Sequence, residues 1–239
     1  MHRVKQAIIM AAGIGKRLQP VTLDVPKPLV RVNGVCMIDT VIQGLHANGI
    51  EKIYVVVGYL KEQFLFLEKY YNGLKLIENP YYDIYNNIAS LYMAREHIED
   101  AMILDGDQII YDHRILVPEF ERSGYNGVWT ENETDEWLMT VENGIVTHCS
   151  RSGGSRGWQL FSVSRWSAED GRKLKQHVEK EFEEKKNRQI YWDDIAMFCY
   201  PEEYQLGVHE MEAGALIEVD NISELIKLDK SYADFGRQV

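Results

Sequence analysis

Three groups of residues in this sequence have the types and spacing to act on phosphate. The first is a glycine loop followed by two cations, Ala11-Ala12-Gly13-Ile14-Gly15-Lys16-Arg17-Leu18. Its spaced glycines let backbone N–H groups approach an anion, which is typical of a phosphate-binding loop. The Walker pattern is disfavoured because Gly-Lys-Ser/Thr is missing, and the dinucleotide fingerprint because Leu18 stands where a third glycine belongs.

The second group is a lysine held between two prolines, in Val25-Pro26-Lys27-Pro28-Leu29-Val30. Proline fixes its own backbone and restricts the residue before it, so this segment should be rigid and extended. We expect such a segment to aim Lys27 at a fixed point.

The third group is Asp105-Gly106-Asp107, which follows the apolar run 101–104. Two carboxylates at the end of a buried strand suit a hard divalent cation that also meets a nucleotide phosphate. Turn chemistry alone would also explain an Asp-Gly pair. The phosphate loop elsewhere in the chain favours metal binding by Asp107.

The elements that must position these residues alternate between strand and helix. The glycine loop follows a short apolar strand, and the next expected elements are a helix at 37–48, a strand at 53–57, a helix at 61–71, a strand at 74–77, a helix at 88–97 and a strand at 101–104. This order predicts a doubly wound, mostly parallel, Rossmann-like α/β sheet with ligands at the carboxyl ends of its strands. Asn86, Asn87 and Ser90 precede or begin a helix, so they either cap it or contact a nucleotide.

Beyond Gly124 the pattern changes to short alternating strands at 127–130, 137–141 and 144–148, which predict a small β-region inserted over the acceptor half of the site. The loop 150–157 is expected to be mobile, with solvated basic residues. A strand at 158–164, a charged helix at 168–188, a strand at 215–221 and a helix at 222–228 should follow. We expect one domain over 1–239, with 1–124 as the nucleotide-binding half and 125–239 as the acceptor-binding half.

Composition excludes several classes of function. The net charge of -11 argues against a general nucleic-acid binder. Three distant cysteines without metal-type spacing make a disulfide framework or a zinc site unlikely to form. The sequence has no run long enough for a membrane span and no signal-peptide core, so we expect a cytoplasmic protein.

The glycine loop and Pro26-Lys27-Pro28-Leu29 together resemble the N-terminal signature of the nucleotidyltransferases. Over nearly the whole chain the sequence is most similar to the bacterial CTP:phosphocholine cytidylyltransferases of the choline-incorporation pathway. The segments that carry this similarity are the two above, Val57 to Phe64, Tyr85-Asn86-Asn87, Ser90-Leu91-Tyr92, Asp105 to Asp107, Glu136-Trp137, Tyr191-Trp192-Asp193 and Glu218-Val219-Asp220.

This resemblance implies transfer of CMP from CTP to phosphocholine, with release of pyrophosphate and formation of CDP-choline. It also implies that Asp107 and Asp220 hold Mg²⁺, that Lys16 and Arg17 contact the β- and γ-phosphates, and that Lys27 neutralises the reacting phosphates. The expected nucleotide contacts are Ala11, Ala12, Gly13, Gly15, Asn86, Asn87, Ser90 and Asp105.

Choline carries a quaternary ammonium, which aromatic faces and carboxylates hold best. The candidates in this chain are the aromatic residues Trp137, Tyr191 and Trp192 and the carboxylates Asp193 and Glu218. Each aromatic residue has the alternative of belonging to the core. Two other functions remain open: a sugar-1-phosphate nucleotidylyltransferase, disfavoured by the aromatic residues, and a non-catalytic nucleotide-binding module, disfavoured by intact Lys27, Asp107 and Asp220.

Overall fold

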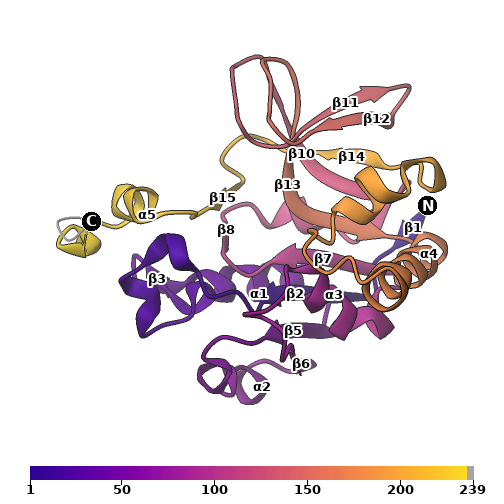
Figure 1. The fold of residues 1–239 in the computed structure, drawn as a ribbon. Coiled ribbons are helices and arrows are strands. Elements are labelled where there is room, and N and C mark those ends of the chain that lie inside the picture. Colours follow the sequence, from indigo (N-terminus) through magenta and orange to yellow (C-terminus); the bar gives the residue numbers. More distant parts are fainter. Residues whose placement is uncertain (236–239) are drawn as a thin grey trace.

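A nine-stranded sheet runs through the protein, whose computed structural model describes residues 1–235 (Figure 1). Its centre consists of four parallel strands in the spatial order β7 (Ala101–Asp105), β2 (Gln6–Ala11), β5 (Ile53–Val57) and β6 (Leu74–Glu78). All residues of β5 are buried, as expected for a parallel strand covered on both faces.

Successive side chains of β2 enter two different cores. Ala7, Ile9 and Ala11 pack in the cluster that contains α1 (Met37–Ala47), whereas Ile8 and Met10 pack in the cluster that contains α3 (Ile88–Ala94) and α4 (Ala168–Glu179). Because side chains alternate across a strand, each core covers one face of the sheet. The expected doubly wound α/β fold is confirmed.

The order of the parallel strands creates a switch point. The chain passes from β2 to β5 and then β6 on one side, and it returns with β7 on the other side of β2. In such sheets ligands bind where the strand order reverses, at the carboxyl ends. Here those ends lead into the glycine loop and into Asp105-Gly106-Asp107.

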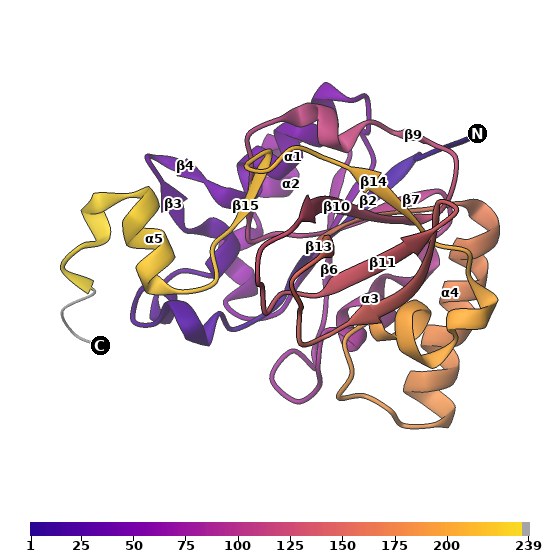
Figure 2. The ribbon, with the colours of Figure 1, turned by 90° about the horizontal axis from the view of Figure 1, so that it is seen from above.

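The expected inserted β-region is continuous with the central sheet (Figure 2). The long strand β13 (Gly157–Trp166) pairs with β7 at one end and with β10 (Gly124–Thr130) and β11 (Leu138–Glu142) elsewhere. Two further strands, β12 (Ile145–Ser150) and β14 (Gly207–Glu210), extend this part. The strands beyond Gly124 are therefore part of the same sheet as the parallel strands of the first half of the chain.

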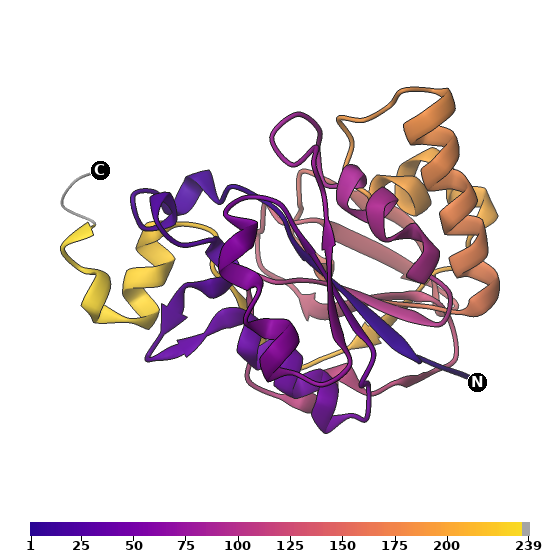
Figure 3. The same cartoon turned by 90° about the horizontal axis from the view of Figure 1, so that it is seen from below.

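The C-terminal segment packs against loops from the start of the chain (Figure 3). Strand β15 (Leu216–Glu218) pairs with β8 (Gln108–Ile110), and α5 (Ile222–Leu228) follows. The apolar contacts come from Leu18, Val30, Val32, Met37, Val219, Ile222 and Leu225. Asn33 adds a hydrogen bond from its backbone N to Asp229 Oδ2 at 2.7 Å. This packing brings Asp220 beside the glycine loop.

Three expected helices are interrupted. The segment 61–71 forms a 3₁₀ turn (Lys61–Phe64) and the short α2 (Leu67–Tyr70), and α3 continues only as a 3₁₀ turn (Arg95–His97). After α4 the chain forms a π-helical turn (Lys180–Glu184), which points the buried Glu181 inward. Tyr200 donates a hydrogen bond to Glu181 there at 2.8 Å. The helical conformation ends before 188, where Lys186 adopts a left-handed φ of +56°.

The remaining elements are short. They are β1 (His2–Arg3), β9 (Glu119–Phe120), β3 (Arg31–Val32), β4 (Val35–Cys36), a π-helical turn (Ile195–Cys199), and 3₁₀ turns at Lys16–Leu18, Val21–Leu23, Lys27–Leu29, His113–Leu116, Pro201–Glu203 and Lys230–Tyr232. Within residues 1–235 no helix is both long enough and apolar enough to span a membrane.

An aromatic cluster corrects one expectation from the sequence. Trp192 is only 1% exposed, and its ring lies 5.9 Å from that of Tyr125 and 6.1 Å from that of Trp166. All three residues belong to the core beside α4. Trp192 is therefore a core residue and not an aromatic wall for an acceptor, since its ring is covered by other side chains.

We expect Trp192→Ala to lower the free energy of unfolding by about 3 to 5 kcal/mol, because it opens a large cavity in the core. The matched control is Tyr191→Ala, whose side chain is 49% exposed and whose loss should cost about 1 kcal/mol or less. Urea unfolding of both variants measures the difference. A smaller cost for Trp192 than for Tyr191 would contradict the core assignment.

Candidate active site

The glycine loop is fixed by its contact with the lysine segment. Gly15 adopts a left-handed conformation with φ +69°, and a Cβ there would lie 3.0 Å from Lys27 Cβ. The Thr22 hydroxyl donates a hydrogen bond to the Gly15 carbonyl at 2.8 Å. Only glycine combines this backbone conformation with so close an approach. The loop and Lys27 are therefore positioned together.

The end of β7 is held just as closely to the end of β2. The Gly106 backbone N donates to the Met10 carbonyl at 2.9 Å, and a Cβ on Gly106 would lie 3.2 Å from the same oxygen. The glycine between the two aspartates thus allows the two loops to touch. Asp105 and Asp107 flank this contact at the switch point.

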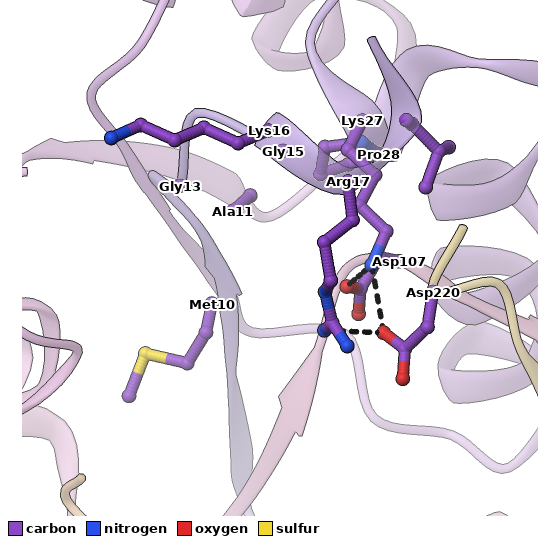
Figure 4. A pocket seen from close by; sticks show the side chains of 11 residues that line it. Met10, Ala11, Gly13, Gly15, Lys16, Arg17, Lys27, Pro28, Asp107 and Asp220 are labelled. Atoms are coloured by element: carbon purple, nitrogen blue, oxygen red, sulfur yellow. Dashed lines mark hydrogen bonds and ion pairs between the residues drawn. The ribbon is translucent and has the colours of Figure 1, made fainter. Parts of the chain in front are cut away.

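Two cations and two carboxylates converge beside the glycine loop (Figure 4). Lys27 Nζ donates to Asp107 Oδ2 and, at 3.3 Å, to Asp220 Oδ1, and Arg17 contacts the same Asp220 oxygen at 2.7 Å. Burial acts to lower the pKa of Lys27, but Asp107 and Asp220 outweigh it and raise that pKa. Lys27 therefore stays charged although its side chain is only 9% exposed.

Figure 4 also shows that Lys16 points away from this ion cluster. Its side chain is exposed on the other side of the loop. The two adjacent cations therefore face different regions, with Arg17 directed to the carboxylates.

Two hollows meet at the ion cluster. The first, which we call the phosphate hollow, has a volume of about 290 Å³ and is lined by Met10, Ala11, Gly13, Gly15, Lys16, Arg17, Leu18, Lys27, Pro28, Asp107 and Asp220. The second, the acceptor hollow, has a volume of about 360 Å³ and is lined in part by Asn87, Asp105, Asp135, Glu136, Trp137, Arg151, Leu160, Ser162, Tyr191, Asp193 and Glu218. Arg17, Asp107 and Asp220 line both hollows. A group transferred from one hollow to the other would pass these three residues.

The carboxylates of Asp107 and Asp220 fit a magnesium site. Both contact the single Lys27 Nζ, so they lie within reach of one atom. Mg²⁺ in nucleotide enzymes is commonly held by one or two carboxylates, with phosphates and water completing the octahedron. Residues 1–235 contain no group of three or more His, Cys, Asp or Glu residues that could hold a metal ion by themselves.

The acceptor hollow is lined by many carboxylates and by few positively charged side chains that could neutralise them. Burial raises the pKa of Asp193 to about 7, although the neighbouring Tyr125 hydroxyl favours the ionised form. Burial, followed by the charge of Asp107, raises the pKa of Glu218 to about 7. Asp193 Oδ1 is buried without a hydrogen-bond partner among the described residues. An uncompensated buried carboxylate is costly, so this hollow favours a cation.

Two of the three expected aromatic residues line the acceptor hollow. The rings of Trp137 and Tyr191 lie 6.0 Å apart in an edge-to-face arrangement. Trp192 lies behind them in the core, as described above. The expected aromatic set is therefore reduced to two residues, beside Asp193 and Glu218.

The expected nucleotide contacts separate into two sets. Ala11, Gly13 and Gly15 line the phosphate hollow, whereas Asn87 and Asp105 line the acceptor hollow. Ala12, Asn86 and Ser90 line neither hollow, because Ala12 is buried, Asn86 donates to the Gln189 carbonyl at 3.2 Å, and Ser90 is buried and accepts from Asn79 at 3.0 Å. Neither asparagine caps α3 with its side chain.

The sequence missed Arg151, which it placed in a solvated loop. The guanidinium contacts Asp194 Oδ1 at 2.6 Å and lies 4.0 Å from the Phe198 ring centre. Ser162 and Leu160 on β13 were also missed as lining residues. Alternation along β13 is the only sequence signal that would have suggested them, whereas nothing local in the Ser-Arg-Gly loop indicates the distant partner of Arg151.

Comparisons with known proteins agree with this geometry. The chain is 38% identical over 229 residues to the 2-aminoethylphosphonate cytidylyltransferase of Lancefieldella rimae, covering 95% of this chain and 92% of the relative. It is 32% identical over 225 residues to the choline-phosphate cytidylyltransferase of Streptococcus pneumoniae, covering 94% of this chain and 97% of the relative.

Solved structures of CTP-dependent transferases are also similar to this chain. The CTP:phosphocholine cytidylyltransferase of S. pneumoniae superposes with a TM-score of 0.86 at 32% identity, over 96% of this chain and 99% of that one. The inositol-1-phosphate CTP transferase of T. maritima shares the fold, with a TM-score of 0.75 at 18% identity over 98% of this chain and 96% of that one. The sequence profile of the Nucleotidyl transferase family matches residues 6–126. The chain belongs to the nucleotidyl transferase family.

Proposed function

We propose that this protein transfers CMP from CTP to phosphocholine and releases pyrophosphate. The observation that carries the proposal is the junction of the two hollows at Arg17, Asp107 and Asp220. One hollow offers a glycine loop and cations for a triphosphate, and the other offers carboxylates and aromatic rings for a cationic acceptor. The name and coverage of the S. pneumoniae relative, which is similar to this chain in sequence and in structure, support the same reaction.

In this reaction an acceptor phosphate oxygen forms a bond to the α-phosphorus while the bond from that phosphorus to the pyrophosphate oxygen breaks. No covalent intermediate with the enzyme is needed, so the residues act by positioning and by neutralising charge. Lys27 lies at the junction, where it contacts the reacting phosphates. Arg17 and Lys16 bind the β- and γ-phosphates. Asp107 and Asp220 would hold Mg²⁺, which would offset the negative charge of the phosphates.

We further propose that residues 1–124 form the nucleotide-binding half of one domain and 125–239 its acceptor-binding half. The two halves exchange residues at the junction, since Asp220 lies beside the glycine loop and Asp105 lines the acceptor hollow. The three cysteines, Cys36, Cys149 and Cys199, are all unpaired. Free thiols suit a reducing compartment, which supports a cytoplasmic location.

A second acceptor, 2-aminoethylphosphonate, is favoured by two observations. The relative at 38% identity bears that substrate in its name. In addition, Asp193 lines the acceptor hollow, and a primary ammonium could donate a hydrogen bond to its carboxylate whereas a quaternary ammonium could not. Both acceptors place a cation in the acceptor hollow and an attacking oxygen at the junction.

Measuring pyrophosphate release with CTP and either phosphocholine or 2-aminoethylphosphonate decides between these two acceptors. Phosphoethanolamine serves as a further comparison. We expect kcat/KM to be higher for phosphocholine than for phosphoethanolamine, because the smaller, more strongly hydrated ammonium costs more to strip of water. Trp137→Ala and Tyr191→Ala should each raise the phosphocholine KM with little effect on the KM for CTP. A preference for 2-aminoethylphosphonate would select the second acceptor, and activity with sugar 1-phosphates alone would exclude both.

Loss of Lys27 should lower kcat at saturating CTP by about a hundredfold or more, because its charge neutralises phosphates that gain charge in the transition state. Lys16→Ala is the matched control within the same site, since its side chain points away from the ion cluster. That variant should raise the KM for CTP and retain kcat. Steady-state kinetics of the two variants test this contrast, and an intact kcat in Lys27→Ala would make Lys27 a binding residue only.

Asp107→Asn and Asp220→Asn should each abolish most turnover and weaken Mg²⁺ binding in the presence of CTP, because each removes one of two metal ligands. Calorimetric titration of Mg²⁺ with CTP present measures this without turnover. The control is Asp229→Asn, which loses the hydrogen bond from Asn33 but lies outside both hollows. Near-normal activity and metal affinity in Asp220→Asn would contradict its assignment.

A further inference from the structure

Arg151 makes an ion pair between two walls of the acceptor hollow. It lies on the loop between β12 and β13, and its guanidinium contacts Asp194 Oδ1 at 2.6 Å. The Asp194 side chain is only 4% exposed. Breaking an ion pair that involves a buried carboxylate leaves an uncompensated charge and is costly. The contact therefore differs from an ordinary surface salt bridge.

The Asp194 carboxylate also organises the wall that carries Tyr191. Its second oxygen, Oδ2, accepts a hydrogen bond from the Tyr191 backbone N at 3.0 Å. The same turn presents Asp193 to the acceptor hollow. One carboxylate thus fixes the turn with one oxygen and binds Arg151 with the other.

Arg151 also contacts two aromatic rings. The guanidinium carbon lies 4.0 Å from the centre of the Phe198 ring and 5.7 Å from that of Trp137. Trp137 in turn makes edge contacts with Phe198 at 5.4 Å and Tyr191 at 6.0 Å. Arg151 therefore contacts Trp137 directly and is linked through Asp194 to the turn that carries Tyr191.

The loop of Arg151 is also tied to the loop that carries Trp137. Backbone hydrogen bonds of 3.0 Å run in both directions between Thr134 and Gly154. We call segments 131–137 and 150–156 together the flap. Asp135, Glu136, Trp137 and Arg151 of the flap line the acceptor hollow.

We propose that Arg151 is a positioning residue for the acceptor: its ion pair with Asp194 fastens the flap to the 191–194 turn and so fixes the distance between Trp137 and Tyr191. Because Asp194 neutralises its charge, Arg151 can lie near Trp137 without repelling a cationic acceptor. This inference rests on the proposed function, since it assigns Arg151 to the acceptor and not to CTP.

The kinetic test compares two arginines of the same flap. Arg151→Ala should raise the phosphocholine KM by about tenfold with the KM for CTP within about twofold, because an ion pair to the buried Asp194 carboxylate is lost on the acceptor side alone. Arg151→Lys should retain part of the affinity, since it keeps the charge but loses the planar contact with the rings. The control is Arg156→Ala, whose ion pair with exposed Glu131 is long, at 3.7 Å, and should change neither KM.

Two further measurements separate positioning from a direct contact with substrate. Adding Asp194→Asn to Arg151→Ala should raise the phosphocholine KM little further, because both changes break the same ion pair. Backbone amide hydrogen exchange across 131–137 should become faster in Arg151→Ala and stay unchanged in Arg156→Ala. Fully additive effects, or unchanged exchange in Arg151→Ala, would overturn the positioning role.

The outcomes also separate this inference from the proposed function. If the unsubstituted enzyme fails to use phosphocholine, the proposed acceptor is wrong, whereas the exchange measurement still reports on the flap. If phosphocholine is used and Arg151→Ala leaves its KM unchanged, the proposed function stands and the role of Arg151 is overturned.

Discussion

Repulsion among carboxylates is the constraint on which this site depends. The acidic residues around the junction of the two hollows are Asp105, Asp107, Glu136, Asp193, Glu218 and Asp220. The neighbouring cations, Lys27, Arg17 and Arg151, leave part of this charge uncompensated, and the raised pKa values of Asp193 and Glu218 reflect the burial and charge around them. In the proposed function, a divalent metal and a cationic acceptor would supply the missing positive charge. Binding of either cation would be favourable, because it would relieve the unfavourable free energy of the buried, uncompensated carboxylates.

The fold makes this crowding possible by bringing distant segments to one point. The switch point between β2 and β7 places the glycine loop against Asp105-Gly106-Asp107, with the Gly106 N to Met10 O hydrogen bond at 2.9 Å between them. Strand β15 then leads Glu218 and Asp220 to the same place through its pairing with β8. Rigid β-structure on several sides keeps like charges close, where flexible loops would let them separate.

The parts of the fold that the sequence predicted are those with strong local patterns. The run at 53–57 is apolar throughout and became the fully buried β5, and Gly15 of the glycine loop stands where a close approach to Lys27 requires glycine. Composition could not distinguish Tyr191 from Trp192, although one is 49% exposed and the other 1%. The turn at 191–194 determines which of the two side chains is buried. The ion pair of Arg151 could not be predicted from the sequence for a similar reason, because its partner Asp194 is 43 residues away.

The packing of α5 on the first loops has a consequence for synthesis on the ribosome. Lys27 and Asp220, which share one hydrogen bond, are 193 residues apart. At about 5 to 20 residues per second, the ribosome adds Asp220 roughly 10 to 40 s after Lys27. During that interval the emerging glycine loop has no second carboxylate and no α5 to cover its apolar side chains. A nascent chain therefore lacks the contact between Lys27 and Asp220, and with it the proposed metal-binding pair, until residue 220 has been added.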